Sequence, residues 1–297
     1  MHLVFMGMGG SLSAAPLRHL LGADHTFSAV VIAAADRRTG WRALPRPGGA
    51  KRIAVLQPSP ARRGSIVQMA WEHGIPLFEV GDLSAEATRD ALRMLAPDAV
   101  LVSCFAYRIP RSLLGVPKHG FLNLHPSLLP AYRGPFPVFW QLRDGLGEIG
   151  LTIHRMDERL DRGPVALHKT VSLETGMSGS EIDRRIGEQG GKLFASALEK
   201  LAAGTLTFEP QVEGGSYQGY PRDEDFTLDR SWSARRVFSF MRGTAEWRRL
   251  YSLVEGGRTW RLREAVSYEP QGLQSRPVLA DGNGVSIQFR PGILHAH

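Results

Sequence analysis

The sequence predicts an α/β fold, with a mostly parallel sheet in the larger N-terminal part and a small β-barrel domain at the C-terminus. Apolar strand segments alternate with helical segments through the N-terminal part, which is typical of parallel sheets with right-handed crossovers. The segment AVLVSCF at 99–105 is continuously apolar, as expected for a strand covered on both faces. Beyond residue 225, short strands separated by glycine turns replace this alternation.

The elements follow from hydrophobic periodicity and from the residues that begin and end helices. The predicted strands of the N-terminal part lie at 2–7, 26–36, 75–80, 99–105, 120–125 and 150–157. The predicted helices between and after them lie at 13–22, 64–74, 84–96, around Trp140 and at 178–204. The last helix is supported by the spacing of Ser178 and Glu181, which fits a capping box. The paired glycines Gly190 and Gly191 inside it predict close backbone packing.

The chain is long enough for one large domain or two unequal domains, and the sequence favours two. We expect a catalytic domain at 1–207, a polar linker at 208–224 and a C-terminal β domain at 225–297. The last of these begins with a short helix at 233–243 and continues with strand segments. No run of 18 or more apolar residues and no leader peptide is evident, so a cytoplasmic protein without membrane contact is the expectation. The sequence leaves the oligomeric state open.

The single cysteine, Cys104, excludes an internal disulfide and a metal site built from several cysteines. Because it follows an apolar strand, we expect a buried and inert thiol. The ten histidines show no metal-ligand spacing, so no metal is predicted.

The excess positive charge of the chain is concentrated in one segment, 37–63, which contains no acidic residue. Its basic residues are Arg37, Arg38, Arg42, Arg46, Lys51, Arg52, Arg62 and Arg63. Prolines and glycines between them predict a long exposed loop. Such a loop either keeps the protein soluble or contacts a partner that carries phosphate groups.

The stretch FLNLHPSLLPAYRG contains the best candidate for a catalytic site. Asn123 and His125 lie two residues apart on a predicted strand, so their side chains leave from the same face. The strand ends at the carboxyl edge of the sheet, where ligands bind in α/β folds. By the same argument, the strand at 150–157 delivers Asp157 and Asp161 to this edge.

These residue types suit transfer to an amine without a covalent enzyme adduct, because no nucleophilic serine or cysteine stands beside them. The amide of Asn123 and a protonated His125 can stabilise an oxygen that becomes negative, while a carboxylate helps to remove a proton from the amine. The alternative is a structural pair, a core histidine beside a turn asparagine.

The segments NLHPSLLPAYRG and LTIHRMDERLDRGPV closely resemble the signature of the folate-dependent formyltransferase family. The opening VFMG, the strand AVLVSCFAYRIP and the YPRDEDFTLD hinge resemble the two-domain members, including methionyl-tRNA formyltransferases and sugar-nucleotide N-formyltransferases. The resemblance implies a Rossmann-like catalytic domain, an OB-like C-terminal barrel and catalytic residues at Asn123, His125 and Asp161.

The resemblance also implies that the formyl donor is 10-formyl-tetrahydrofolate. The residues implied in folate binding are Ala106, Tyr107, Ile109, Pro110 and Asp157. The acceptor stays open between methionyl-tRNA and an amino-sugar nucleotide or another small amine. For the acceptor, the candidate binding residues are Ser127, Arg133, Arg37, Arg38 and Arg42, the last three because the basic loop resembles the tRNA-contacting loop of the tRNA enzymes.

Three other functions are alternatives to formyl transfer. A nicotinamide-binding N-terminus is disfavoured, because Leu12 stands where the dinucleotide fingerprint needs a third small residue. Hydrolysis of formyl-folate would use the same three residues, and a catalytically inactive RNA-binding protein would retain only the basic surface. His154 is interpreted as structural, and Arg133 either contacts a substrate or bonds loop carbonyls.

Overall fold

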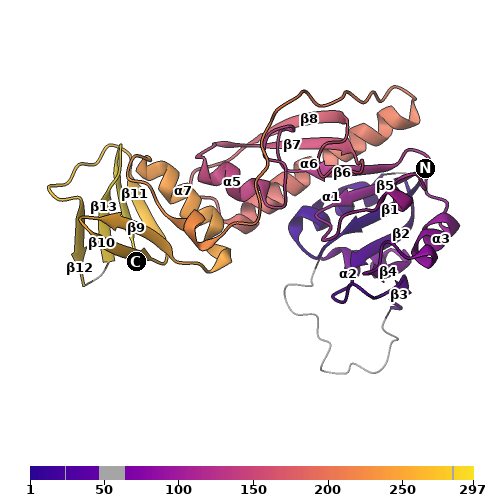
Figure 1. Ribbon diagram of the computed structural model, residues 1–297, viewed down its shortest axis with the longest axis horizontal. Coiled ribbons are helices and arrows are strands. Elements are labelled where there is room, and N and C mark those ends of the chain that lie inside the picture. The colour runs from indigo at the N-terminus through magenta and orange to yellow at the C-terminus, as the bar shows by residue number, and fades with distance from the viewer. Residues whose placement is uncertain (24, 47–63, 283) are drawn as a thin grey trace. The chain divides into compact units, whose positions relative to one another are not determined.

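The computed structural model describes residues 1–23, 25–46, 64–282 and 284–297 (Figure 1). Contacts between residues divide the chain into two compact units. The first unit comprises 1–133, 150–170 and 183–216, and the second comprises 134–149, 171–182 and 217–297. The linker predicted at 208–224 is therefore shared, since the residues up to Ser216 belong to the first unit.

The first unit is built on a sheet whose described strands follow the order β3-β4-β2-β1-β5-β6-β7-β8 (Figure 1). Their bounds are β1 His2–Gly7, β2 Thr26–Ala33, β3 Arg42–Ala43, β4 Leu77–Val80, β5 Ala99–Ser103, β6 Phe121–His125, β7 Glu148–Arg155 and β8 Val165–Ser172. The pairs β4-β2, β2-β1, β1-β5 and β5-β6 are parallel, which confirms the predicted α/β class. The sequence did not predict β8, whose burial pattern lacks a regular period.

Strand β7 differs from the expectation in direction, because it pairs antiparallel with β6. The prediction that it ends at the same edge as β6 by the rule for parallel strands is therefore wrong. The loop that follows β7, rather than the strand end itself, must return the chain to the site. Antiparallel pairing places His154 directly opposite Asn123 and Thr152 opposite His125.

The helices are α1 Ser11–Leu21, α2 Ile66–Glu72, α3 Glu86–Met94, α4 Arg111–Leu114, α5 Pro137–Arg143, α6 Gly179–Ala202 and α7 Ala234–Thr244, with short 3₁₀ turns η3 Asp223–Phe226 and η4 Ala245–Trp247. The predicted capping box of α6 is present, since the Ser178 amide donates to the Glu181 carboxylate at 2.8 Å and the Glu181 amide donates to the Ser178 hydroxyl at 3.4 Å.

Helix α6 lies close to both β6 and α1, and its glycines explain why. A Cβ atom on Gly190 would lie 2.3 Å from a methyl of Leu124, and one on Gly191 would lie 2.8 Å from the His19 Cβ. These distances are shorter than van der Waals contact, so only glycine permits this approach. The predicted close packing is confirmed, and it supports the strand that carries the candidate site.

One core cluster of the first unit lies among β1, β2, β5 and the start of β6. Val4, Val31, Val100 and Phe121 are among its fully buried members. Burying such a side chain contributes about 1.5–3 kcal/mol to folding. The strand ends that carry polar groups are thus supported by a rigid apolar layer.

The second unit contains antiparallel strands, as predicted for a small C-terminal β domain. Its described strands are β9 Tyr251–Glu255, β10 Arg258–Leu262, β11 Ala265–Glu269, β12 Val278–Asp281, β13 Gly284–Gln288 and β14 Ile293–Ala296. They form a β10-β9 pair and a sheet in the order β11-β14-β13-β12. Phe139, Phe226, Phe240 and Tyr251 pack as neighbouring rings in its core. None of the helices in the described ranges has the length and apolar character needed to cross a membrane.

Candidate active site

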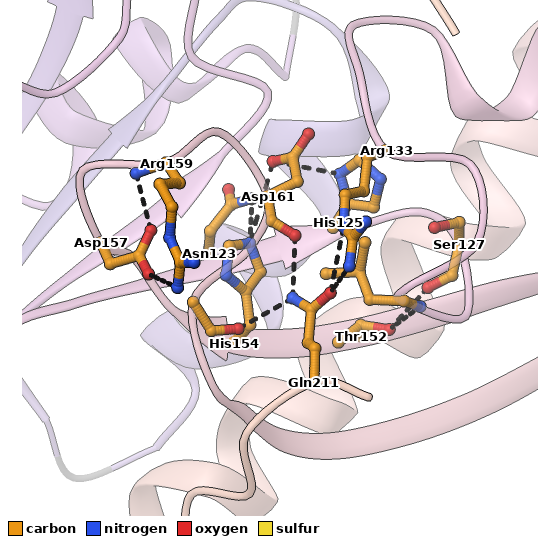
Figure 2. A network of polar contacts seen from close by, with 12 residues as sticks. Asn123, His125, Ser127, Arg133, Thr152, His154, Asp157, Arg159, Asp161 and Gln211 are labelled. Atoms are coloured by element: carbon orange, nitrogen blue, oxygen red, sulfur yellow. Dashed lines mark hydrogen bonds and ion pairs between the residues drawn. The ribbon is translucent and has the colours of Figure 1, made fainter. Parts of the chain in front are cut away.

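Strand β6 presents Asn123 and His125 from one face, and both reach a cluster of polar groups in the first unit (Figure 2). His125 is 4% exposed, whereas Asn123 is half-buried. The two-residue spacing acts as the sequence predicted, because alternate residues of a strand share a face.

The imidazole of His125 is held by a backbone carbonyl. Its Nε2 lies 2.9 Å from the Tyr132 oxygen. Because a carbonyl can only accept, Nε2 must carry the hydrogen and donate it. The Nδ1 atom is consequently the nitrogen that can gain or lose a proton. It faces Asp161, whose Oδ1 lies 3.7 Å away.

Asp161 comes from the loop after β7 and is 9% exposed. The residue has a left-handed backbone conformation, with φ of 53°. The loop returns tightly, since a Cβ atom on Gly163 would lie 1.8 Å from the Arg155 oxygen. Only glycine fits there. The loop thus brings the predicted carboxylate to the predicted imidazole, although β7 runs opposite to the expected direction.

The site contains a second histidine that the sequence interpretation assigned to structure. The Asn123 Nδ2 atom lies 3.0 Å from the His154 Nε2 (Figure 2). An amide NH₂ can only donate, so this Nε2 accepts and His154 is neutral. Burial, reinforced by the neighbouring His125, lowers the pKa of His154 from 6.5 to about 4. Because His154 Nε2 accepts one Nδ2 hydrogen of Asn123, the Asn123 amide is oriented, and its second Nδ2 hydrogen can donate to a ligand.

The pairing of β6 with β7, rather than the local sequence, shows that His154 belongs to the site. His154 is separated from Asn123 by 31 residues and meets it through the antiparallel register of β6 and β7. The alternation of Ile153 and His154 predicts a strand, which β7 confirms, but alternation alone does not identify the residue across the ladder.

Thr152 and Ser127 support the loop that follows β6. The Thr152 hydroxyl donates to the Ser127 oxygen at 2.6 Å and accepts from the Leu129 amide at 3.1 Å. The Ser127 hydroxyl donates to the Ala131 oxygen at 2.6 Å and is fully buried. Its predicted role in acceptor binding stays a prediction, and this geometry instead places the hydroxyl inside the loop.

Arg133 is only 4% exposed and is bonded within the protein. Its Nε and Nη2 atoms donate to the Gln211 Oε1 at 3.1 and 2.8 Å, and Nη1 donates to the Gly214 oxygen at 2.9 Å. Of the two interpretations that the sequence left open, the structure shows bonding to the loop. A substrate contact by Arg133 stays a prediction.

The residues predicted to bind folate lie on two loops. Ala106 is exposed in the loop after β5, while Ile109 is 2% exposed and belongs to the core. The Tyr107 hydroxyl donates to the Ala34 oxygen, and Pro110 immediately precedes α4. Because β5 and β6 are adjacent and parallel, this loop lies at the same sheet edge as Asn123.

Asp157 lies in the other loop of the predicted folate site, after β7. Its carboxylate accepts from the backbone amide of Arg159 at 2.8 Å and from the Arg159 guanidinium at 3.2 Å. The Asp157 side chain is 30% exposed. Folate binding by these residues stays a prediction.

Cys104 departs from the sequence expectation. The residue turns the chain at the end of β5 with φ of 57° and is exposed as a whole, so the prediction of a buried residue is wrong, although the surrounding chain desolvates its thiol. Desolvation by the surrounding chain, with a contribution from Asp183, raises the pKa of the thiol to about 11. Cys104 is therefore protonated near neutral pH, which makes it a poor nucleophile.

The described part of the basic segment, 37–46, has carboxylate and aromatic partners from the folded protein. Arg37 lies 5.0 Å above the Tyr107 ring, Arg38 is 3.6 Å from Asp36, and Arg42 pairs with Glu79. The rest of the basic loop, from residue 47 to residue 63, lies outside the described residues. Contact of Arg37, Arg38 and Arg42 with an acceptor stays a prediction.

Comparison with known proteins identifies the family of this chain. The family model described as formyl transferase matches residues 3–198. The methionyl-tRNA formyltransferase of Marinobacter nauticus is 30% identical over an alignment of 298 positions, which covers 99% of this chain and 89% of that protein.

Solved structures with the same fold include two proteins whose structures contain a folate compound. WlaRD, a sugar 3N-formyl transferase solved in the presence of dTDP and 5-N-formyl-THF, has a TM-score of 0.66 and 12% identity, and the match covers 100% of this chain and 97% of that chain. HypX from Aquifex aeolicus in complex with tetrahydrofolic acid has a TM-score of 0.61 and 20% identity. The match covers 99% of this chain but only 43% of HypX.

Proposed function

The chain belongs to the formyl transferase family, and on that premise we propose that it transfers a formyl group from 10-formyl-tetrahydrofolate to a primary amine. The first candidate acceptor is the amino group of methionyl-tRNA. One observation carries the chemistry: Asn123, His125 and Asp161 lie together at the carboxyl end of β6, with 3.7 Å between His125 Nδ1 and Asp161 Oδ1.

In this proposal Asn123 stabilises the oxygen of the formyl group. As the amine nitrogen bonds to the formyl carbon, the carbonyl electrons move onto that oxygen. One Nδ2 hydrogen of Asn123 is committed to His154, and the other donates to the developing negative charge. A donor already oriented before the reaction needs no reorganisation in the transition state.

His125 carries the proton between the two nitrogens of the reaction. Its Nδ1 accepts a proton from the attacking amine, which forms an imidazolium held between the Tyr132 carbonyl and the Asp161 carboxylate. The same proton then passes to the folate nitrogen as its bond to the formyl carbon breaks. Products are an N-formyl amine and tetrahydrofolate, and the histidine ends in its starting state.

The formyl donor would be held by the loop from Ala106 to Pro110 and by the loop that contains Asp157. The first loop fits this role because it leaves the sheet beside Asn123 and exposes Ala106, while Ile109 anchors it in the core. When bound, the folate supplies the activated formyl group.

For the acceptor, the full-length similarity to a methionyl-tRNA formyltransferase supports methionyl-tRNA. An amino-sugar nucleotide is the second candidate, because a sugar N-formyl transferase shares the fold over nearly its whole chain. Formyl-folate hydrolysis requires only water in place of the amine.

One assay separates these possibilities. The enzyme is incubated at low salt with radioactive formyl donor and, in separate reactions, charged initiator tRNA, a dTDP-amino sugar or no amine. We expect label in the methionyl-tRNA. Label only in the sugar would establish the second candidate, and formate release independent of any amine would establish hydrolysis. Donor binding without any of these products would reject the proposed transfer to these acceptors.

A further inference from the structure

The segment from Gln211 to Ser216, here called the strap, is bonded along the loop that follows β6. Ser216 contributes three bonds. Its amide donates to the Pro130 oxygen at 3.2 Å, its hydroxyl accepts from the Tyr132 amide at 2.8 Å, and its carbonyl accepts from the Arg133 amide at 3.0 Å. The strap therefore holds both peptide groups that flank the Tyr132 side chain.

Gln211, at the other end of the strap, connects two loops through one side-chain amide (Figure 2). Its Oε1 accepts two bonds from the Arg133 guanidinium, at 3.1 and 2.8 Å. Its Nε2 donates to the backbone oxygens of Asp161 and Gly163, both at 2.8 Å. An amide oriented by acceptors on one side and donors on the other has a single favourable orientation.

The strap contacts two groups that orient the His125–Asp161 pair, the peptide groups of Tyr132 and the backbone of Asp161. The Tyr132 carbonyl determines which nitrogen of His125 carries hydrogen, and it belongs to the peptide between Tyr132 and Arg133 that Ser216 holds. The Asp161 backbone, whose left-handed conformation aims the carboxylate, is held by Gln211. A displacement of the strap would thus disturb the imidazole and the carboxylate together.

We propose that the strap is a positioning element of the active site, which keeps His125 protonated at Nε2 and its Nδ1 directed at Asp161. The strap makes no bond to the reacting atoms and acts through Tyr132 and Asp161. Its effect on turnover rests on the proposed formyl transfer, whereas its effect on the tautomer of His125 does not.

Gly215 offers a way to displace the strap without altering any of its polar groups. A Cβ atom on Gly215 would lie 2.1 Å from the Pro130 oxygen, and the residue has φ of 79°. Gly204, at the end of α6, has a similar φ of 68° but meets nothing within 4 Å. Gly204→Ala therefore reproduces the backbone strain of Gly215→Ala without the collision.

The first experiment reads the imidazole directly, by two-bond ¹H–¹⁵N correlation spectra of the full chain labelled with ¹⁵N-histidine. His125 is assigned from the signal missing in His125→Gln. We expect an Nε2–H tautomer in the unsubstituted protein and in Gly204→Ala, and a mixture of tautomers in Gly215→Ala. An unchanged tautomer in Gly215→Ala that folds like Gly204→Ala would overturn the proposal.

The second experiment measures turnover of Ser216→Ala, which loses the bond from the Tyr132 amide, against Ser216→Thr, which retains a hydroxyl. We expect kcat to fall about tenfold in the alanine variant, as for loss of one hydrogen bond that positions a catalytic group, with KM for the donor unchanged. The threonine variant should recover most of the rate. Equal rates in both variants would contradict the proposal.

The two readouts also separate this inference from the function. If no amine is formylated, the tautomer of His125 still tests the strap. If the strap has no positioning role, the unsubstituted protein still transfers formyl groups while Gly215→Ala and Ser216→Ala match their controls.

Discussion

The proposed catalytic cluster and the described basic segment are both polar, but the protein holds them in opposite ways. His125 and Asp161 are 4% and 9% exposed; the Tyr132 carbonyl holds the His125 imidazole, and the Gln211 side-chain amide holds the Asp161 backbone oxygen. The side chains of Arg38 and Arg42 are 94% and 67% exposed and pair with carboxylates at the surface. Buried, pre-oriented groups act on reacting atoms, whereas exposed charges act through a field that salt screens. Substitutions in the buried cluster should therefore change the rate by orders of magnitude more than substitutions in the basic segment.

The largest effect is expected from Asn123→Ala, which removes the donor to the formyl oxygen. By analogy with the loss of one oxyanion donor elsewhere, kcat should fall by about 10²–10³ with little change in donor affinity. Single-turnover transfer from labelled donor measures the loss, and donor binding by calorimetry is the control. A fall of less than threefold would place the oxyanion elsewhere.

His125→Ala should lower kcat by at least about a hundredfold, because it removes the proton carrier. Folding and donor binding should be nearly unaffected. His73→Ala serves as the matched control, since His73 is an exposed histidine of the same unit outside the site. Near-normal turnover of His125→Ala would refute the proposed proton path.

His154→Leu should have a smaller effect on rate, about tenfold in kcat, because Asn123 loses the acceptor that orients it but keeps its second hydrogen. A rate equal to that of the unsubstituted enzyme would show that Asn123 is oriented without His154.

The same variant should change how stability depends on pH. The folded pKa of His154, about 4, lies below the ordinary value of 6.5, so the folded state binds fewer protons and stability is lost as pH falls from 6.5 toward 4. The loss attributable to this group is about 3 kcal/mol. Urea unfolding at pH 7 and pH 4 should show a smaller decrease in the free energy of unfolding for His154→Leu than for the unsubstituted protein. Equal decreases would contradict a neutral, buried His154.

The smallest effect is expected from replacing Arg37, Arg38 and Arg42 together with glutamine. With a tRNA acceptor, KM should rise several-fold at low salt and its dependence on salt should flatten, while a small amine and the folate donor are spared. Replacing the exposed Arg93, Lys192 and Lys200 with glutamine is the control for net charge. If both triple variants raise KM for the tRNA acceptor equally, the attraction comes from the net charge of the whole surface rather than from the basic segment.

Much of the architecture was accessible from local sequence. Apolar runs identified six of the eight described strands of the large sheet, although not β3 or β8. Ser178 and Glu181 marked the start of α6, and the spacing of Asn123 and His125 predicted that both side chains leave from one face. The prediction of a buried Cys104 failed because an apolar run does not reveal where a positive φ ends the strand. The predicted direction of β7 was wrong because the apolar pattern of a buried strand does not show whether it pairs parallel or antiparallel with its neighbour.

The sequence by itself determined which chemical groups stand at the end of β6, because side-chain direction on a strand follows a two-residue period. Tertiary structure alone decided their partners. His154 meets Asn123 across 31 residues, and Gln211 meets Arg133 across 78 residues. Such contacts depend on the register and direction of strands and on the path of a distant segment. No local pattern encodes these, since they arise only when the whole chain closes around its core.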